Sequence, residues 1–186
     1  MTPLQQKVAE AIIRSCNAFK GEFNSPFSCE DLAALAGVEL SLGADEPAPG
    51  AHGLFQFRRP ALEDAYEWLI ASHRSFWNSI PDRVRISPVT FTKVVKTIER
   101  LDSQVIYALA YSERYRHAWD FDAANLTRGE RAALWWLYGG CAKRSYSPDL
   151  ELFYKRLKSC LGMDIEHPQK RLERFRAYRS EMFFQE

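Results

Sequence analysis

The chain has 186 residues, of which 46% are hydrophobic and 26% charged, and its 25 Lys and Arg nearly balance its 24 Asp and Glu. This composition indicates a folded protein of one or two small domains and excludes a disordered chain. The near-zero net charge argues against an acidic mimic of nucleic acid and against a uniformly basic coat protein. No apolar run reaches the roughly 18 residues of a membrane span, so we expect no membrane partner.

The N-terminal part predicts two helices. The first spans residues 3–19, where Thr2 can act as the cap and one apolar stripe follows helical spacing. Ser28 and Asp31 form a second box-like start, and the helix that follows them is expected to end at Gly37. The N-terminus lacks a basic start followed by an apolar stretch, so a secretory signal is not expected.

The segment 24–38, NSPFSCEDLAALAGV, together with the helix before it, is similar to the start of LexA-type repressor domains. In such a domain a small, Ala-rich helix packs tightly, and a Gly permits the turn into a recognition helix. The resemblance covers about a fifth of the chain and implies a winged helix-turn-helix that binds DNA. It stops at Val38, where a third helix should follow within a few residues.

Residues 39–57 instead change in character, and the stretch 42–50 is expected to form a mobile loop, because Pro, Gly and acidic residues cluster there. This loop is a candidate linker. We expect a single domain over residues 1–186, with a candidate division into an N-terminal hairpin and loop (1–57) and a main helical body (58–186).

The middle of the chain predicts a strongly amphipathic helix at 60–78 and a second helix from Ser87 to Leu101. The exposed face of the second helix is typical of a recognition helix that contacts phosphates and base edges. Its polar residues are Lys93, Lys96, Thr97 and Arg100. Residues 104–122 fit an alternating strand pattern slightly better than a helical one, which favours a small β-hairpin that would act as a wing.

The C-terminal part predicts three more helices. Thr127 and Glu130 form a capping box before an apolar helix that stops at Gly139, and further helices begin at Ser147 and Pro168. The aromatic residues of this region have three interpretations: core, the interface for a protein partner, or a platform for unpaired bases. The residues in question are Trp119, Phe121, Trp135, Trp136 and Tyr138.

The balanced charge conceals an asymmetry. Residues 1–80 carry six basic and ten acidic side chains, whereas residues 81–186 carry nineteen basic and fourteen acidic ones. The second half can therefore present a basic face, to which Lys170, Arg171 and Arg174 would contribute. Ordinary solvated helix faces explain the same charges.

No motif points to an enzyme, a metal site or a cofactor. The four cysteines contain no C-x-x-C pair, and the four histidines stand singly. We therefore expect reduced thiols in a cytoplasmic protein. Neighbouring carboxylates occur at Glu63 and Asp64, and also at 120 and 122 and at 164 and 166, but such pairs are common on surfaces.

Together these patterns predict a mostly α protein, a compact multi-helix bundle with winged-helix character. The expected function is that of a non-catalytic regulator associated with nucleic acid, which would bind through Lys93, Lys96, Thr97, Arg100, Lys170, Arg171 and Arg174. The alternative is a helical accessory or inhibitor module that docks a larger protein through Trp119, Trp135, Trp136 and Tyr138. The oligomeric state does not follow from the sequence.

Overall fold

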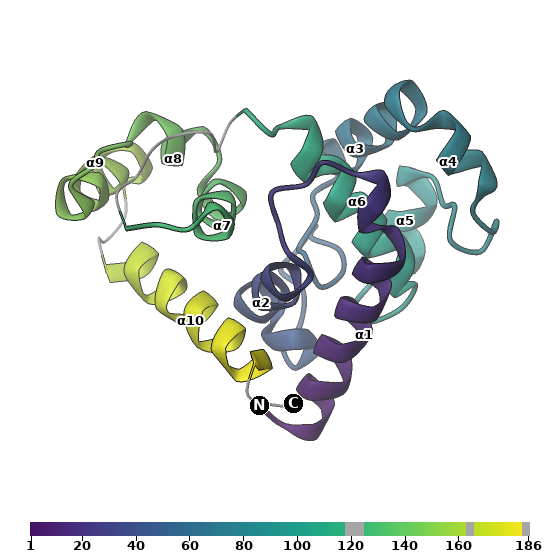
Figure 1. Ribbon diagram of the computed structural model, residues 1–186, viewed down its shortest axis with the longest axis horizontal. Coiled ribbons are helices and arrows are strands. Elements are labelled where there is room, and N and C mark those ends of the chain that lie inside the picture. Colours follow the sequence, from purple (N-terminus) through teal and green to yellow (C-terminus); the bar gives the residue numbers. More distant parts are fainter. Residues whose placement is uncertain (118–124, 163–165, 184–186) are drawn as a thin grey trace.

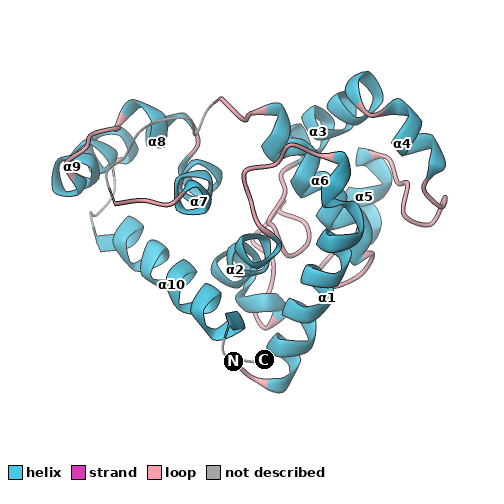
Figure 2. Cartoon of the chain, viewed as in Figure 1, coloured by secondary structure: helices cyan, strands magenta, loops and turns pink. Residues whose placement is uncertain are grey.

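The computed structural model describes residues 1–117, 125–162 and 166–183 and confirms a compact, mostly α protein (Figure 1). Over these ranges the chain forms ten α-helices, two short 3-10 helices and no β-strand (Figure 2). The helices are α1 (Pro3–Phe19), η1 (Lys20–Glu22), α2 (Cys29–Leu40), η2 (Ser41–Gly43), α3 (Arg59–Ser72), α4 (Arg74–Ser79), α5 (Pro88–Val94), α6 (Leu101–Arg114), α7 (Arg128–Tyr138), α8 (Gly140–Arg144), α9 (Leu150–Leu161) and α10 (Glu166–Phe183).

Helix α2 lies in the middle of the molecule, with α1 on one side and α10 on the other (Figure 1). Its start is fixed by the expected capping box, because Ser28 Oγ accepts the N–H of Asp31 at 3.0 Å and the Asp31 carboxylate accepts the N–H of Ser28 at 3.0 Å. The residues from Leu32 to Val38 are all buried. A helix that is apolar nearly all round needs neighbours on every side, which explains its central place.

The expected recognition helix and wing are not present as predicted. Helix α5 ends at Val94, before most of the polar residues that were assigned to it. Residues 101–114 form the single helix α6, so the hairpin prediction is wrong there, and the rest of that segment from residue 118 lies outside the described residues. Residues 105–110 are all buried inside the helical core, and a helix buried all round satisfies a strand pattern as well as a helical one.

Most of residues 51–57, which follow the loop expected at 42–50, are buried. The buried amide of Gln104 on α6 accepts the N–H of Leu54 at 2.7 Å and donates to the carbonyls of Thr97 and Glu99, each at 2.7 Å. A Cβ at Gly53, where φ is +71°, would lie 2.3 Å from the Gln104 amide oxygen. Only glycine permits this close approach. The division of the chain at residue 57 stays a prediction.

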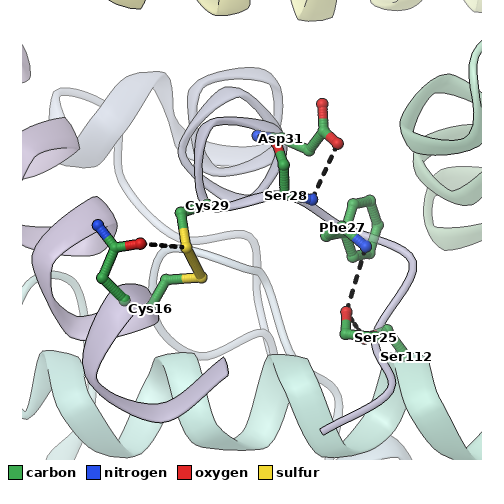
Figure 3. Close-up of a disulfide and its surroundings, with 8 residues drawn as sticks. Cys16, Ser25, Phe27, Ser28, Cys29, Asp31 and Ser112 are labelled. Carbon is green, nitrogen blue, oxygen red and sulfur yellow. Dashed lines mark hydrogen bonds between the residues drawn. A yellow bond between two sulfur atoms is a disulfide. The ribbon is translucent and has the colours of Figure 1, made fainter. Parts of the chain in front are cut away.

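All four cysteines are paired, which corrects the expectation of reduced thiols. Cys16 on α1 joins Cys29 at the start of α2 (Figure 3), and Cys141 on α8 joins Cys160 on α9. Disulfides persist in oxidising compartments, so this pairing suggests such a compartment more than the cytoplasm. Among the described residues, no helix is both long and apolar enough to cross a membrane.

Helix α10 is fastened to the capped ends of two other helices. Arg179 Nε donates to the carboxylate of Asp31 at 2.7 Å, and Arg176 Nε donates to that of Glu130 at 2.6 Å. The same two carboxylates complete the capping boxes of α2 and α7. The ring of Tyr178 lies so close to Gly37 that a Cβ there would be 2.6 Å from it. The C-terminal helix therefore packs directly on α2.

Candidate active site

A cavity of about 590 Å³ opens beside the C-terminal end of α2, within the size range of small-molecule and cofactor sites. Its walls come from α2, the loop before α3, and helices α3, α6, α7 and α10. The residues that line it are Glu39, Ala48, Ala51, Phe55, Gln56, Phe57, Arg58, Pro60, Ala61, Asp64, Tyr111, Trp136, Leu137 and Arg171.

Glu39 is the lining residue with the most altered chemistry. Burial of its carboxyl group raises the pKa of Glu39 from 4.5 to about 7, although the nearby Arg171 guanidinium acts in the opposite direction. Glu39 is also the penultimate residue of α2, and the partial negative charge at a helix C-terminus further disfavours a carboxylate. The side chain is therefore an acid that keeps a substantial protonated fraction near neutral pH.

The backbone around this acid adopts uncommon conformations. Ser41 and Leu42, directly after α2, have φ values of +48° and +53°, and Gln56, which lines the same cavity as Glu39, has +51°. Left-handed backbone is rare for residues other than Gly, Asn and Asp and carries a conformational cost. Such strain gathers at functional sites, where the surrounding structure holds it in place.

Aromatic side chains form much of the cavity wall. The ring centroids of Trp136 and Phe57 lie 5.4 Å apart, and those of Trp136 and Tyr111 also lie 5.4 Å apart. The indole N–H of Trp136 donates to the carbonyl of Phe55 at 3.4 Å, which ties α7 to the loop before α3. Burial raises the pKa of Tyr111 to about 12, so its phenol is a neutral hydrogen-bonding group.

Asp64 on α3 is the second carboxyl group that lines the cavity. It accepts a hydrogen bond from the Tyr115 hydroxyl at 2.5 Å and forms an ion pair with Arg114 at 3.3 Å. Arg58 lies on the same wall and donates to the carbonyl of Pro49 at 2.6 Å. The two acids of the cavity thus have different surroundings: one is desolvated, whereas the other is ion-paired.

The first set of residues predicted to bind nucleic acid lies between α5 and α6. Lys93 is in the last turn of α5, and Lys96 and Thr97 follow in the loop; both lysines are exposed. Arg100, the residue before α6, donates to the carbonyl of Arg83 at 2.7 Å. These residues share one region but not the continuous recognition helix that was expected.

The second set lies on α10, on a different side of α2 from α5 in the view of Figure 1. Lys170 is exposed, whereas Arg171 turns into the cavity with Glu39. Arg174 donates to Ser41 Oγ at 3.2 Å. A role for either set in nucleic-acid binding stays a prediction.

The aromatic residues of the alternative hypothesis have different environments. Trp135 and Tyr138 on α7 are 6% and 8% exposed, so both belong to the hydrophobic core of the protein. Trp136 is half-buried and lines the cavity. Trp119 lies outside the described residues. Their role in docking a protein partner stays a prediction.

No sequence motif marks Glu39, the central acid of this cavity. One signal for it was present: Glu39 follows the apolar run LAALAGV and precedes Leu40, so it interrupts a stretch destined for the core. A polar residue at a core position is more informative than an exposed one. Asp64 was noted only as half of a carboxylate pair.

Comparison with known proteins adds no assignment: no protein-family model, no curated protein and no solved structure matches this chain.

Proposed function

We propose that the protein is an enzyme that cleaves glycosidic bonds, with Glu39 as its general acid. The observation that carries the proposal is a single carboxylic acid with a raised pKa in an aromatic-walled cavity. Glycosidases keep one carboxyl group protonated at neutral pH by burying it, and use it to protonate the oxygen of the leaving sugar. The regulator of nucleic acid that the sequence led us to expect stays a separate prediction.

The chemistry requires one proton to travel out and back. Protonated Glu39 gives its proton to the glycosidic oxygen, the bond from that oxygen to the anomeric carbon breaks, and the leaving alcohol keeps the electron pair. Water then adds its hydroxide to the anomeric carbon, and its remaining proton returns to the Glu39 carboxylate. The acid is regenerated, and one glycoside plus one water give two sugars.

The remaining lining residues suit a carbohydrate. Flat apolar rings such as Trp136 and Phe57 can pack against the C–H faces of sugars, while Gln56 and the neutral Tyr111 phenol can hydrogen-bond sugar hydroxyls. Asp64 is the candidate second carboxylate, which would support the positive charge at the anomeric carbon while Glu39 takes up the proton of the water. Its ion pair with Arg114 holds it in place for that role.

A cleavage assay tests the proposal. The intact protein is incubated with β-linked N-acetylhexosamine oligosaccharides, bacterial cell-wall glycan and an α-linked glucan, and new reducing ends or cleaved fragments are measured. We expect cleavage of at least one of these, and a loss of about 100- to 10,000-fold in Glu39→Gln, because the general acid is removed. Glu46→Gln, an exposed carboxyl in the neighbouring loop, is the matched control.

A second measurement needs no substrate. The carboxyl carbon of Glu39, assigned by its absence from Glu39→Gln, is followed by NMR as the pH changes. An apparent pKa near 7 supports the proposal. Titration near the ordinary value of 4.5 would contradict it, as would equal cleavage by Glu39→Gln and the unchanged protein.

The nucleic-acid hypothesis has a separate test. Binding to mixed-sequence duplex DNA at low salt, lost on Lys93→Glu with Lys96→Glu, would favour it, because phosphate contacts weaken steeply with salt and with loss of charge. No shift of the duplex at low salt would contradict it and leave the cavity as the functional centre.

A further inference from the structure

Arg171 is the residue of the C-terminal helix α10 that lines the cavity of Glu39. It lies in the second turn of α10 and lines the same cavity as Glu39, which stands at the end of α2. Helices α10 and α2 pack directly on each other. One turn before Arg171, the His167 Nδ1 atom lies 3.1 Å from the Tyr138 hydroxyl, so this end of α10 also contacts α7.

We propose that Arg171 is a positioning residue whose guanidinium stabilises the carboxylate that Glu39 becomes after it gives up its proton. The proposal rests on the proposed function, because only an acid that cycles between two charge states needs such a group. A desolvated carboxyl group donates its proton poorly unless its charged form finds a partner. A fixed cation within the cavity supplies that partner without reorganisation of solvent.

The other charged and titratable groups around Glu39 do not replace Arg171. These groups are Arg58, Asp64, Tyr111, Tyr138 and His167. Arg58 donates to a loop carbonyl, and Asp64 is paired with Arg114. Burial raises the pKa of both tyrosines to about 12, and burial followed by the field of Arg171 lowers the pKa of His167. These three groups are therefore largely neutral near pH 7, and the Arg171 guanidinium acts directly on Glu39.

The sign of the effect distinguishes this role from a structural one. Without Arg171 the carboxylate of Glu39 is less stable, so the pKa of Glu39 rises and the acid becomes weaker. A weaker acid gives a lower maximum rate, yet it stays protonated to higher pH. We therefore expect Arg171→Gln to lower kcat by up to about tenfold and to move the alkaline limb of the pH–rate profile upward by about one pH unit. Damage to the fold alone lowers the rate at every pH and leaves the limb in place.

The test compares Arg171→Gln, Arg171→Lys and Lys170→Gln with the unchanged protein. Arg171→Lys keeps the positive charge, so its pH–rate profile should have the alkaline limb at the same pH as the unchanged protein. Lys170→Gln makes the same charge change one residue earlier, at an exposed position that does not line the cavity, and should leave the limb unmoved. Circular dichroism melts confirm that each variant is folded.

The NMR titration of Glu39 provides the same comparison without substrate. An apparent pKa of Glu39 about one unit higher in Arg171→Gln than in Arg171→Lys supports the role. Equal values in these variants overturn it, even where the protein cleaves glycans and Glu39→Gln does not. If Glu39→Gln cleaves as fast as the unchanged protein, the proposed function fails instead, so the two failures are distinguishable.

Discussion

Two regions of the molecule hold their parts of the cavity in different ways. The body, residues 1–117 with α1 to α6, contains a buried disulfide, with Cys16 at 0% and Cys29 at 4% exposure. The arm, residues 125–162 and 166–183 with α7 to α10, contains a disulfide whose Cys160 is exposed. The body also holds its cavity wall with the buried amide of Gln104, whereas the arm is attached through the partly exposed Arg179.

This difference assigns separate tasks to the two regions. The body supplies the acid and the wall opposite it, and buried hydrogen bonds make that part of a structure slow to open. The arm supplies Trp136 and Arg171, and the arginine of its ion pair with Asp31 is partly exposed. We therefore expect disturbances of the body to affect folding and disturbances of the arm to affect the completion of the site.

The largest effect on stability is expected in the body, at Gln104. Gln104→Leu leaves the N–H of Leu54 and the carbonyls of Thr97 and Glu99 without their partner. The buried N–H of Leu54 left unsatisfied costs about 1–3 kcal/mol, and the two part-buried carbonyls add smaller amounts, so we expect a loss of about 3 kcal/mol in the free energy of unfolding. Urea unfolding measures it, with Gln6→Leu on the surface of α1 as the control. A loss below about 1 kcal/mol would show that the wall does not depend on this amide.

The disulfides test the comparison directly. Loops closed by sequence separations of 13 and 19 residues predict similar stabilisation, about 3 kcal/mol each, from the restricted unfolded chain. Accessibility separates the two bonds: mild reductant followed by alkylation should label Cys141 and Cys160 in the folded protein and leave Cys16 and Cys29 unlabelled. Mass spectrometry identifies the labelled residues. Equal labelling of both pairs under native conditions would break the distinction between body and arm.

The smallest expected effect concerns Glu39 itself. Because its pKa is raised to about 7 in the folded protein and is 4.5 ordinarily, ionisation between these values destabilises the folded state. The stability of Glu39→Gln relative to the unchanged protein should therefore grow as the pH rises from 4.5 to 7 and stay constant above 7. We expect a gain of about 1–2 kcal/mol, below the full linkage value because the side chain is partly exposed.

Urea unfolding at pH 4.5, 6 and 8 measures this gain, with Glu46→Gln as the comparison variant. A gain that shrinks toward pH 8 would contradict the raised pKa.

Much of the fold could be predicted from local signals. The capping boxes at Thr2, Ser28 and Thr127 all form, since such boxes depend on residues three apart on one segment. Residues 104–114 were misassigned because full burial removes the amphipathic pattern that distinguishes a helix from a strand. The burial of residues 51–57 could not be predicted, because the side chain that supports them, Gln104, lies about fifty residues away in the sequence.

The candidate site was missed for a related reason. Neither Glu39 nor Asp64 belongs to a short motif, and the cavity arises only where six separate segments meet. The prediction of reduced thiols was wrong for the same reason, because cysteines 13 and 19 residues apart in the sequence come together across helices. Arg171 was selected, but as a surface charge, since the sequence does not show which face of α10 packs inward.

The packing of α10 on α2 makes helix length part of the site. Asp31 and Glu39 lie eight residues apart on α2, and their partners Arg179 and Arg171 lie eight residues apart on α10 in the reverse order. Eight residues of helix span about 12 Å, so the two acids on α2 and the two arginines on α10 have the same spacing along their helices. Loss of one residue between the two arginines would move one arginine by about 1.5 Å along α10 and turn it by about 100° around the helix axis, relative to the other. The ion pair between Arg179 and the capping residue Asp31 at the start of α2 thereby helps to fix where Arg171 lies near Glu39 at the end of α2.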